Sequence, residues 1–210
     1  MTPDLAALAE RVRERLKDAG GQRVIVGITG TPGAGKSTLA EQLVAALREA
    51  GEDVVHVPMD GFHLADVELA RLGLAHRKGA PATFDAAGYT ALLRRLRENM
   101  DEIVYAPMFE RDIEQPVAGA IPVPRSARVV VTEGNYLLFD GPWAGVRRLI
   151  DEIWYVQPDD VVRRERLLAR HVQFGKSPEA AEAWVAGNDD LNAAEIAATA
   201  TRAALTVAVD

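Results

Sequence analysis

Residues 24–38 read VIVGITGTPGAGKST, and this stretch decides the fold. Residues 24–29 form a short, continuous apolar run, which predicts a strand buried on both faces of a sheet. The chain then satisfies the pattern G-x-x-x-x-G-K-[ST] from Gly30 to Ser37. A helix is expected over residues 36–50. The resulting unit is a strand, a glycine loop and a helix.

A loop of this kind holds the phosphates of a nucleotide. Its glycines let successive backbone N–H groups curl around a phosphate at the positive end of the following helix. Lys36 would bridge the β- and γ-phosphates, Ser37 would place its hydroxyl on Mg²⁺, and Thr38 would lie near the α-phosphate. A glycine-rich turn with an accidental lysine is the alternative. The predicted nucleotide-binding residues are Gly30, Thr31, Pro32, Gly33, Ala34, Gly35, Lys36, Ser37 and Thr38.

Strand-like and helix-like stretches alternate on both sides of this unit. Further strands are expected at residues 53–59, 128–132, 152–156 and 205–209. Helices are expected at residues 5–16, 65–72, 86–98, 158–173 and 178–200. Residues 119–126 (GAIPVPRS) are the most loop-like stretch. The alternation predicts an α/β fold of the three-layer P-loop NTPase type, with a mostly parallel sheet covered by helices on both faces.

Composition limits the classes of protein to consider. The chain has 210 residues, 48% of them hydrophobic, which predicts a single domain over residues 1–210. A formal charge of −7 argues against nucleic-acid and anionic-membrane partners. The absence of cysteine excludes thiolate metal ligands and thiol catalysis. Neither a signal-peptide core nor a membrane-length apolar run is seen, so a soluble, cytoplasmic protein is expected.

The end of the second expected strand carries VPMDGFH. Ligands of open parallel sheets bind beyond the carboxyl ends of the strands, so Asp60 would project into the same crevice as the glycine loop. A carboxylate there could take the proton of a substrate hydroxyl as that oxygen attacks the γ-phosphorus, or hold Mg²⁺ through water. A turn aspartate before Gly61 is the alternative. His63 is a candidate substrate contact, although a lone histidine is as often packed or solvated.

The third expected strand ends in VVVTEGNY, with Glu133 at its carboxyl end. An acidic residue in this position beside a phosphate loop typically serves the metal and its waters, and Glu133 could instead hold a substrate hydroxyl. A strand-ending acid in a turn is the alternative. The candidate metal ligands are Ser37, Asp60 and Glu133.

A basic helix follows later, with the sequence PDDVVRRERLLARHVQFG. Arg163, Arg166 and Arg170 are spaced three and four residues apart and form one stripe. A solvated face explains many such stripes, and this alternative stays open for Arg163 and Arg164. Arg170 lies late in the helix, before a glycine-interrupted hinge. A small lid over about residues 163–178 would bring Arg170 to the transferring phosphoryl group and exclude water.

Six motifs together resemble the phosphoribulokinase and uridine kinase family of P-loop kinases. In chain order they are GTPGAGKST, PMDGFH, RKGAPATFD, YAPMFER, TEGNYLL and LARHVQFG. The chain looks most like the branch near type I pantothenate kinases and proteins described only as nucleoside/nucleotide kinases. The resemblance implies that Asp60 is the catalytic base and that Arg170 acts from the lid. It also implies that residues 78–85 and 105–111 border the acceptor pocket.

The chain departs from this family at Arg111. Pantothenate kinase-like proteins and uridine kinases carry a histidine in this region. An arginine suits a carboxylate or phosphate on the acceptor, or it forms a surface ion pair with Glu110, Asp112 or Glu114. The aromatic residues nearby could instead stack on a base or pack against a pantothenate-like chain. The candidate substrate contacts are His63, Arg77, Lys78, Phe84, Tyr105, Phe109, Arg111, Glu133, Asn135, Tyr136, Arg166 and Asn188.

The function expected from these residues is ATP-dependent transfer of a phosphoryl group to a hydroxyl of a metabolite. Asp60, Lys36 and Arg170 would be catalytic, with ATP and Mg²⁺ bound. The acceptor would be a nucleoside, a pantothenate-like compound, a sugar or a sugar phosphate. An accessory P-loop ATPase or GTPase is the alternative, although the chain lacks the N-K-x-D motif that usually selects guanine. A homodimer is expected by analogy with other small kinases.

Overall fold

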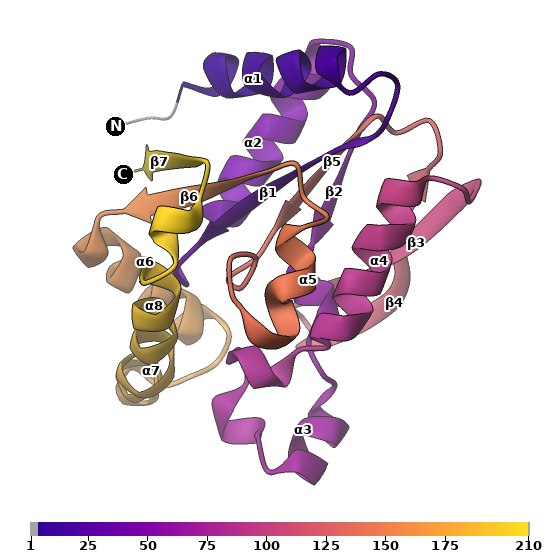
Figure 1. The fold of residues 1–210 in the computed structure, drawn as a ribbon. Coiled ribbons are helices and arrows are strands. Elements are labelled where there is room, and N and C mark those ends of the chain that lie inside the picture. Colours follow the sequence, from indigo (N-terminus) through magenta and orange to yellow (C-terminus); the bar gives the residue numbers. More distant parts are fainter. Residues whose placement is uncertain (1–3, 210) are drawn as a thin grey trace.

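The computed structural model describes residues 4–209 and has a parallel sheet at its centre (Figure 1). Five strands form the sheet in the order β2-β5-β1-β6-β7, and neighbouring strands all run parallel. The predicted α/β fold with a mostly parallel sheet is therefore confirmed. These strands are β1 (Val24–Gly30), β2 (Val54–Pro58), β5 (Val129–Glu133), β6 (Glu152–Pro158) and β7 (Leu205–Val209).

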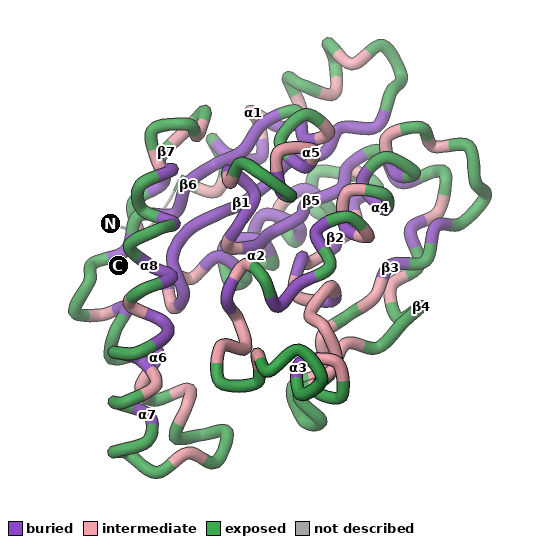
Figure 2. Tube along the Cα trace, turned by 60° about the horizontal axis from the view of Figure 1, so that its bottom comes forward, coloured by how far each residue is buried: buried purple, intermediate pink, exposed green. Residues whose placement is uncertain are grey.

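Helices cover both faces of the sheet, because alternate strand residues point to opposite sides. Ile25 packs into one core with the helices α4 (Ala86–Glu98), α5 (Ala144–Arg147) and α8 (Asp190–Ala197). Its neighbours Val24 and Val26 pack into the other core, with α1 (Leu5–Asp18) and α2 (Lys36–Glu49). Figure 2 shows the central strands as buried between these layers.

A two-stranded antiparallel hairpin projects beside α4. It consists of β3 (Ile103–Glu110) and β4 (Gln115–Pro124). The prediction of a loop over residues 119–126 is wrong for most of that stretch, since β4 runs to Pro124. Three prolines and Gly119 hide the strand in the sequence. Proline is tolerated because, among residues 4–209, β4 pairs with β3 alone and has no strand on its other edge.

The carboxyl-terminal half contains most of the remaining helices. After β6 comes α6 (Asp160–Gln173), followed by α7 (Pro178–Trp184). A π-helical turn, Val185–Asp189, joins α7 to α8, so the single helix expected over residues 178–200 is interrupted and α8 ends at Ala197. A short helix, α3 (Asp66–Leu72), follows β2. None of the helices within residues 4–209 has the length and apolar character needed to cross a membrane.

The sheet brings three loops together at one edge. The strand β5 lies between β1 and β2, and Glu133 at its end is in register with Pro58 of β2 and Ile28 of β1. The glycine loop after β1, the turn after β2 and the residues after β5 therefore meet beyond the carboxyl ends of these strands. This edge holds the candidate site.

Candidate active site

The glycine loop has the conformation that phosphate binding requires. Gly35 caps α2 with a φ of 87°, in the left-handed region that favours glycine. A Cβ atom at Gly33 would lie 2.8 Å from both the Arg163 carbonyl oxygen and Leu167 Cγ. The missing side chain therefore lets α6 rest directly on the loop, so that the phosphate loop and the basic helix form one unit.

Lys36 is held inside this loop. Its side chain is largely buried, and its Nζ donates to the Thr31 carbonyl oxygen at 3.0 Å. Burial lowers the pKa of Lys36, and the nearby carboxylates of Glu133 and Asp60 offset part of this effect. A bound phosphate would supply further negative charge and favour the ammonium form.

Glu133 and Ser37 form a pair of oxygen ligands at the edge of the loop. The Ser37 hydroxyl donates to Glu133 Oε1 at 3.1 Å, and Glu133 is only 4% exposed. Burial, reinforced by the negative charge of Asp60, raises the pKa of Glu133 to about 7. A divalent cation would reverse this shift by favouring the carboxylate.

These oxygens fit Mg²⁺, which prefers hard oxygen ligands and takes few from the protein. Across residues 4–209, no cluster of three or more histidine or carboxylate side chains is placed to hold a metal ion by itself. A magnesium ion would therefore depend on Ser37 and Glu133 together with nucleotide phosphates and water.

Asp60 lies opposite the loop, in a 3₁₀ turn (Met59–Phe62) that directly follows β2. Its Oδ2 is 3.6 Å from Nη2 of Arg111, the first residue after β3. Both side chains are partly exposed to the cavity, at 29% for Asp60 and 43% for Arg111. Of the two alternatives for Arg111, a surface pair with a neighbouring acid is not what the structure shows. Arg111 instead pairs with the candidate catalytic base.

Aromatic side chains form the wall beside Asp60. The ring centroids of His63 lie 4.0 Å from Phe84 and 4.6 Å from Phe109. His63 Nδ1 is 2.8 Å from the Asp60 carbonyl oxygen, which can only accept, so Nδ1 carries the proton. Burial lowers the pKa of His63, and the imidazole is neutral at pH 7. His63 thus fixes the turn that carries Asp60.

Lys78 closes the far end of the acceptor side. Its Nζ donates to Asp66 Oδ1 and to the Glu114 carbonyl oxygen, each at 2.7 Å. The Lys78 backbone is fixed as well, since Asn188 Nδ2 donates to its carbonyl oxygen at 2.9 Å. Lys78 therefore lines the cavity, and its ammonium group is fixed by bonds to other parts of the protein.

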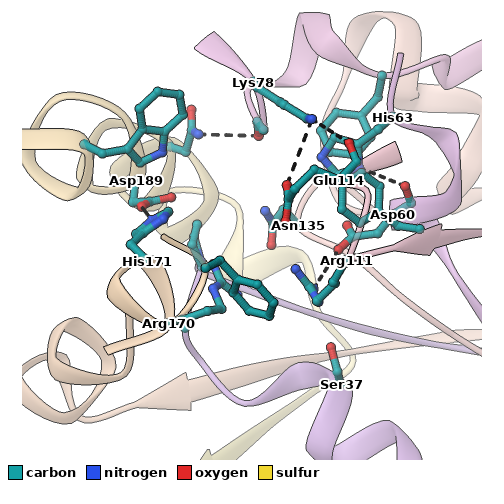
Figure 3. Close-up of a pocket in the computed structure, with 18 of the residues that line it drawn as sticks. Ser37, Asp60, His63, Lys78, Arg111, Glu114, Asn135, Arg170, His171 and Asp189 are labelled. Atoms are coloured by element: carbon teal, nitrogen blue, oxygen red, sulfur yellow. Dashed lines mark hydrogen bonds and ion pairs between the residues drawn. The ribbon is translucent and has the colours of Figure 1, made fainter. Parts of the chain in front are cut away.

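The helix α6 supplies the opposite wall, and Figure 3 shows Arg170 and His171 across the pocket from Asp60. Burial and the positive charge of Arg111 lower the pKa of the Arg170 guanidinium. His171 Nε2 lies 2.8 Å from Asp189 Oδ2, which ties α6 to the π-helical turn. Asp60 and Arg170 thus face one cavity from different elements.

This cavity has a volume of about 370 Å³ and contains most of the predicted site. The predicted residues that line it are Pro32, Gly33, Lys36, Ser37, Asp60, His63, Lys78, Phe84, Phe109, Arg111, Glu133, Asn135 and Arg170.

Five predicted substrate residues do not line the cavity. Tyr105 is 57% exposed, because strand alternation turns it away from its buried neighbours in β3. Tyr136 is buried in the core, where its hydroxyl donates to the Gly79 carbonyl oxygen. Asn188 and Arg77 bond to backbone carbonyl oxygens, of Lys78 and Gly187 respectively. Arg166 lies beside the glycine loop, with Nη1 3.7 Å from where a Cβ of Gly35 would be.

Two further lining residues, Asp189 and Asn192, belong to the segment AGNDDLNAA, whose resemblance to the family's segment after the lid predicts a substrate contact. The lining residues that were not predicted are Ala75, Gly79, Glu114, His171, Phe174, Lys176 and Trp184. Several come from the segment between α6 and α8, where the π-helical turn sets which side chains face inward. A π turn has no sequence signature of the kind that marks a phosphate loop. The resemblance of AGNDDLNAA to the family does not say which of Asn188 and Asp189 lines the pocket, and the structure places Asp189 there.

Comparisons with known proteins agree with the kinase resemblance. A candidate uridine kinase of Schizosaccharomyces pombe is 38% identical over 183 residues, which cover 82% of this chain and 77% of the relative. The pantothenate kinase of Mycolicibacterium smegmatis is 33% identical over 134 residues, which cover 63% of this chain and 43% of that protein. This chain therefore spans less than half of that pantothenate kinase.

A solved structure matches over nearly the whole length. The crystal structure of a candidate fructose transport system kinase from Silicibacter sp. TM1040 has a TM-score of 0.88 and 41% identity, and the match covers 98% of both chains. The family model of the methylmalonyl-CoA mutase-associated GTPase MeaB matches residues 1–62. That match ends just after Asp60 and leaves out most of the acceptor side. The chain belongs to the phosphoribulokinase and uridine kinase family of P-loop kinases.

Proposed function

We propose that this protein transfers the γ-phosphoryl group of ATP to a hydroxyl group of a small metabolite. The observation that carries the proposal is the position of Asp60. Its carboxylate faces the cavity that also holds Lys36, Ser37 and Glu133 of the phosphate side. An accessory ATPase or GTPase needs no base at that position, whereas a kinase needs one beside the acceptor hydroxyl.

The proposed acceptor is a nucleoside, a pantothenate-like compound, a sugar or a sugar phosphate. The aromatic wall of His63, Phe84 and Phe109 supports an acceptor with an apolar face. The charged end with Lys78 and Arg111 supports polar or anionic substituents.

The nucleotide would lie along Gly30–Thr38, with its phosphates on the backbone N–H groups and on Lys36. Ser37 and Glu133 would hold Mg²⁺, with Asp60 as a further ligand directly or through water. When bound, this ion neutralises charge on the phosphates and orients them.

In the proposed mechanism Asp60 accepts the proton of the acceptor hydroxyl. Lys36 and Arg170 neutralise the charge that spreads over the transferring phosphoryl oxygens. The segment 163–178 would act as a lid. Its start rests on the phosphate loop at Gly33 and Arg170 already lines the cavity, so closure would move the far end of the segment and exclude water that would compete as an acceptor. The contact between His171 and Asp189 would hold this segment against the π-helical turn.

The first experiment is a coupled assay of ATP consumption against a panel of hydroxyl acceptors, with Asp60→Asn in parallel. We expect one acceptor to raise the rate far above background, and the variant to lower that rate by at least about 100-fold. ATP should still raise the melting temperature of the variant, because Asp60 is not part of the phosphate loop. A flat background across the panel, unchanged in the variant, would instead support an accessory ATPase.

A further inference from the structure

Arg111 is paired with the proposed catalytic base. Its counter-charge in the structure is Asp60, with 3.6 Å between Nη2 and Oδ2. A carboxylate held by a guanidinium is less available to hydrogen-bond the hydroxyl of an acceptor. Arg111 also lies near other cations, since its positive charge contributes to lowering the pKa values of Arg170 and Lys36.

The other cations of the cavity are bonded or assigned to groups other than Asp60. Lys78 is bonded to Asp66 and to the Glu114 backbone, and its Nζ lies 5.6 Å from the Phe109 ring centre. Lys176 lies over the Trp184 ring at 4.7 Å. Lys36 and Arg170 are assigned to the phosphates of ATP. Of these five cations, Arg111 is the one whose ion pair is with the proposed base.

Arg111 is also placed to reach a ligand. Its side chain is 43% exposed and lines the cavity next to the base, and its guanidinium carbon lies 5.9 Å from the Phe109 ring centre. A guanidinium presents several N–H donors in a fixed plane, which matches a carboxylate or phosphate with two parallel hydrogen bonds. The Phe109 ring lies within cation–π distance of this guanidinium, and the exposed part of the side chain is available to a ligand.

We infer that the acceptor carries an anionic group, a carboxylate or a phosphate, close to the hydroxyl that is phosphorylated. Arg111 binds this group, and the anion of the acceptor replaces Asp60 as the partner of Arg111. Asp60 is thereby released to hydrogen-bond the hydroxyl and take its proton. This inference rests on the proposed function, and it gives Arg111 a role in acceptor choice rather than in phosphoryl stabilisation.

Matched acceptor pairs test the inference. The pairs are pantothenate with pantothenol, glycerate with glycerol, and ribulose 5-phosphate with ribulose, so that carboxylate and phosphate are examined separately. We expect a charged member to be the substrate, and Arg111→Gln to lower kcat/KM for it by about 100-fold, mainly through KM. Arg111→Lys should restore part of the loss. Arg71→Gln removes the same charge from an exposed pair with Glu68 on α3 and is the control.

Two results would overturn the inference. One is a neutral acceptor used as well as its charged counterpart. The other is an equal loss for both members in Arg111→Gln, which would assign Arg111 to the γ-phosphate. Calorimetric titration without nucleotide separates this inference from the kinase function. Binding of a charged member that depends on Arg111, with no phosphoryl transfer, would reject the kinase function and retain the anion site.

Discussion

At the scale of single residues, the ionised carboxylate of Glu133 lowers the stability of the fold because it is buried, and Glu133 is also a proposed metal ligand. Its pKa of about 7 means that the folded protein holds this proton more tightly than the unfolded chain does, where the value is near 4.5. Stability is therefore lost as pH rises from about 4.5 to about 7, by about 3 kcal/mol at most. The amide in Glu133→Gln carries no such penalty.

We expect Glu133→Gln to melt at a higher temperature than the wild type at pH 8, and to differ little from it near pH 4.5. Scanning calorimetry without Mg²⁺ measures this difference, and Glu98→Gln at the exposed end of α4 is the control. A constant difference between the two proteins from pH 4.5 to pH 8 would contradict the prediction. Mg²⁺ with nucleotide should shrink the difference, since the cation favours the carboxylate.

Where a spacing rule applied, the sequence predicted which residues lie together in one cavity. The glycine loop specifies Lys36 and Ser37 by pattern, and Asp60 and Glu133 follow because parallel strands end at one edge of a sheet. The partner of Arg111 could not be predicted, because the contact joins the turn after β2 to the end of β3. Three acidic residues near Arg111 in the chain made a local pair seem equally reasonable.

At the scale of elements, α6 is fixed to α8 by one buried arginine. Arg163 is only 6% exposed, and it bonds Asp160 at 2.9 Å and Asp190 at 3.1 Å. The alternative of a solvated face is therefore wrong for Arg163. Arg164, next in the chain, has a 45% exposed side chain and also pairs with Asp190, at 2.7 Å.

We expect Arg163→Met to lower the free energy of unfolding by about 1–3 kcal/mol, because it leaves Asp190 with a single partner and breaks a buried contact between helices. Arg164→Met should cost less than about 1 kcal/mol, because exposed pairs contribute little. Urea unfolding measures both. Equal losses in the two variants would contradict the buried role of Arg163.

Elements were predictable where their hydrophobic period was uniform. The helix over residues 86–98 and the last strand have the expected bounds. Neither strand of the hairpin was predicted. Prolines interrupt the alternation of β4, and the bulge between Ala106 and Met108 shifts the register of β3. Pairing between strands, rather than local preference, decides such a segment.

At the scale of the whole molecule, nucleotide binding is expected to stabilise the protein. A ligand at 100 times its Kd adds about 2.7 kcal/mol, which raises the melting temperature of a chain of this size by about 5–10 °C. Lys36→Ala should abolish this rise with ATP and Mg²⁺ in a thermal-shift assay. Lys17→Ala on α1 should retain it. An unchanged rise in Lys36→Ala would contradict the phosphate-loop assignment. The homodimer stays a prediction.

The strand order also bears on how such proteins change over evolutionary time. The residues proposed to bind phosphates come from the loop after β1 and from α6, whereas the aromatic wall, Lys78 and Arg111 come from the segments between β2 and β5. Mutations can therefore accumulate in the second set without disturbing the first. A gene duplicate could keep its nucleotide site unchanged and acquire specificity for a new acceptor by altering one stretch of chain.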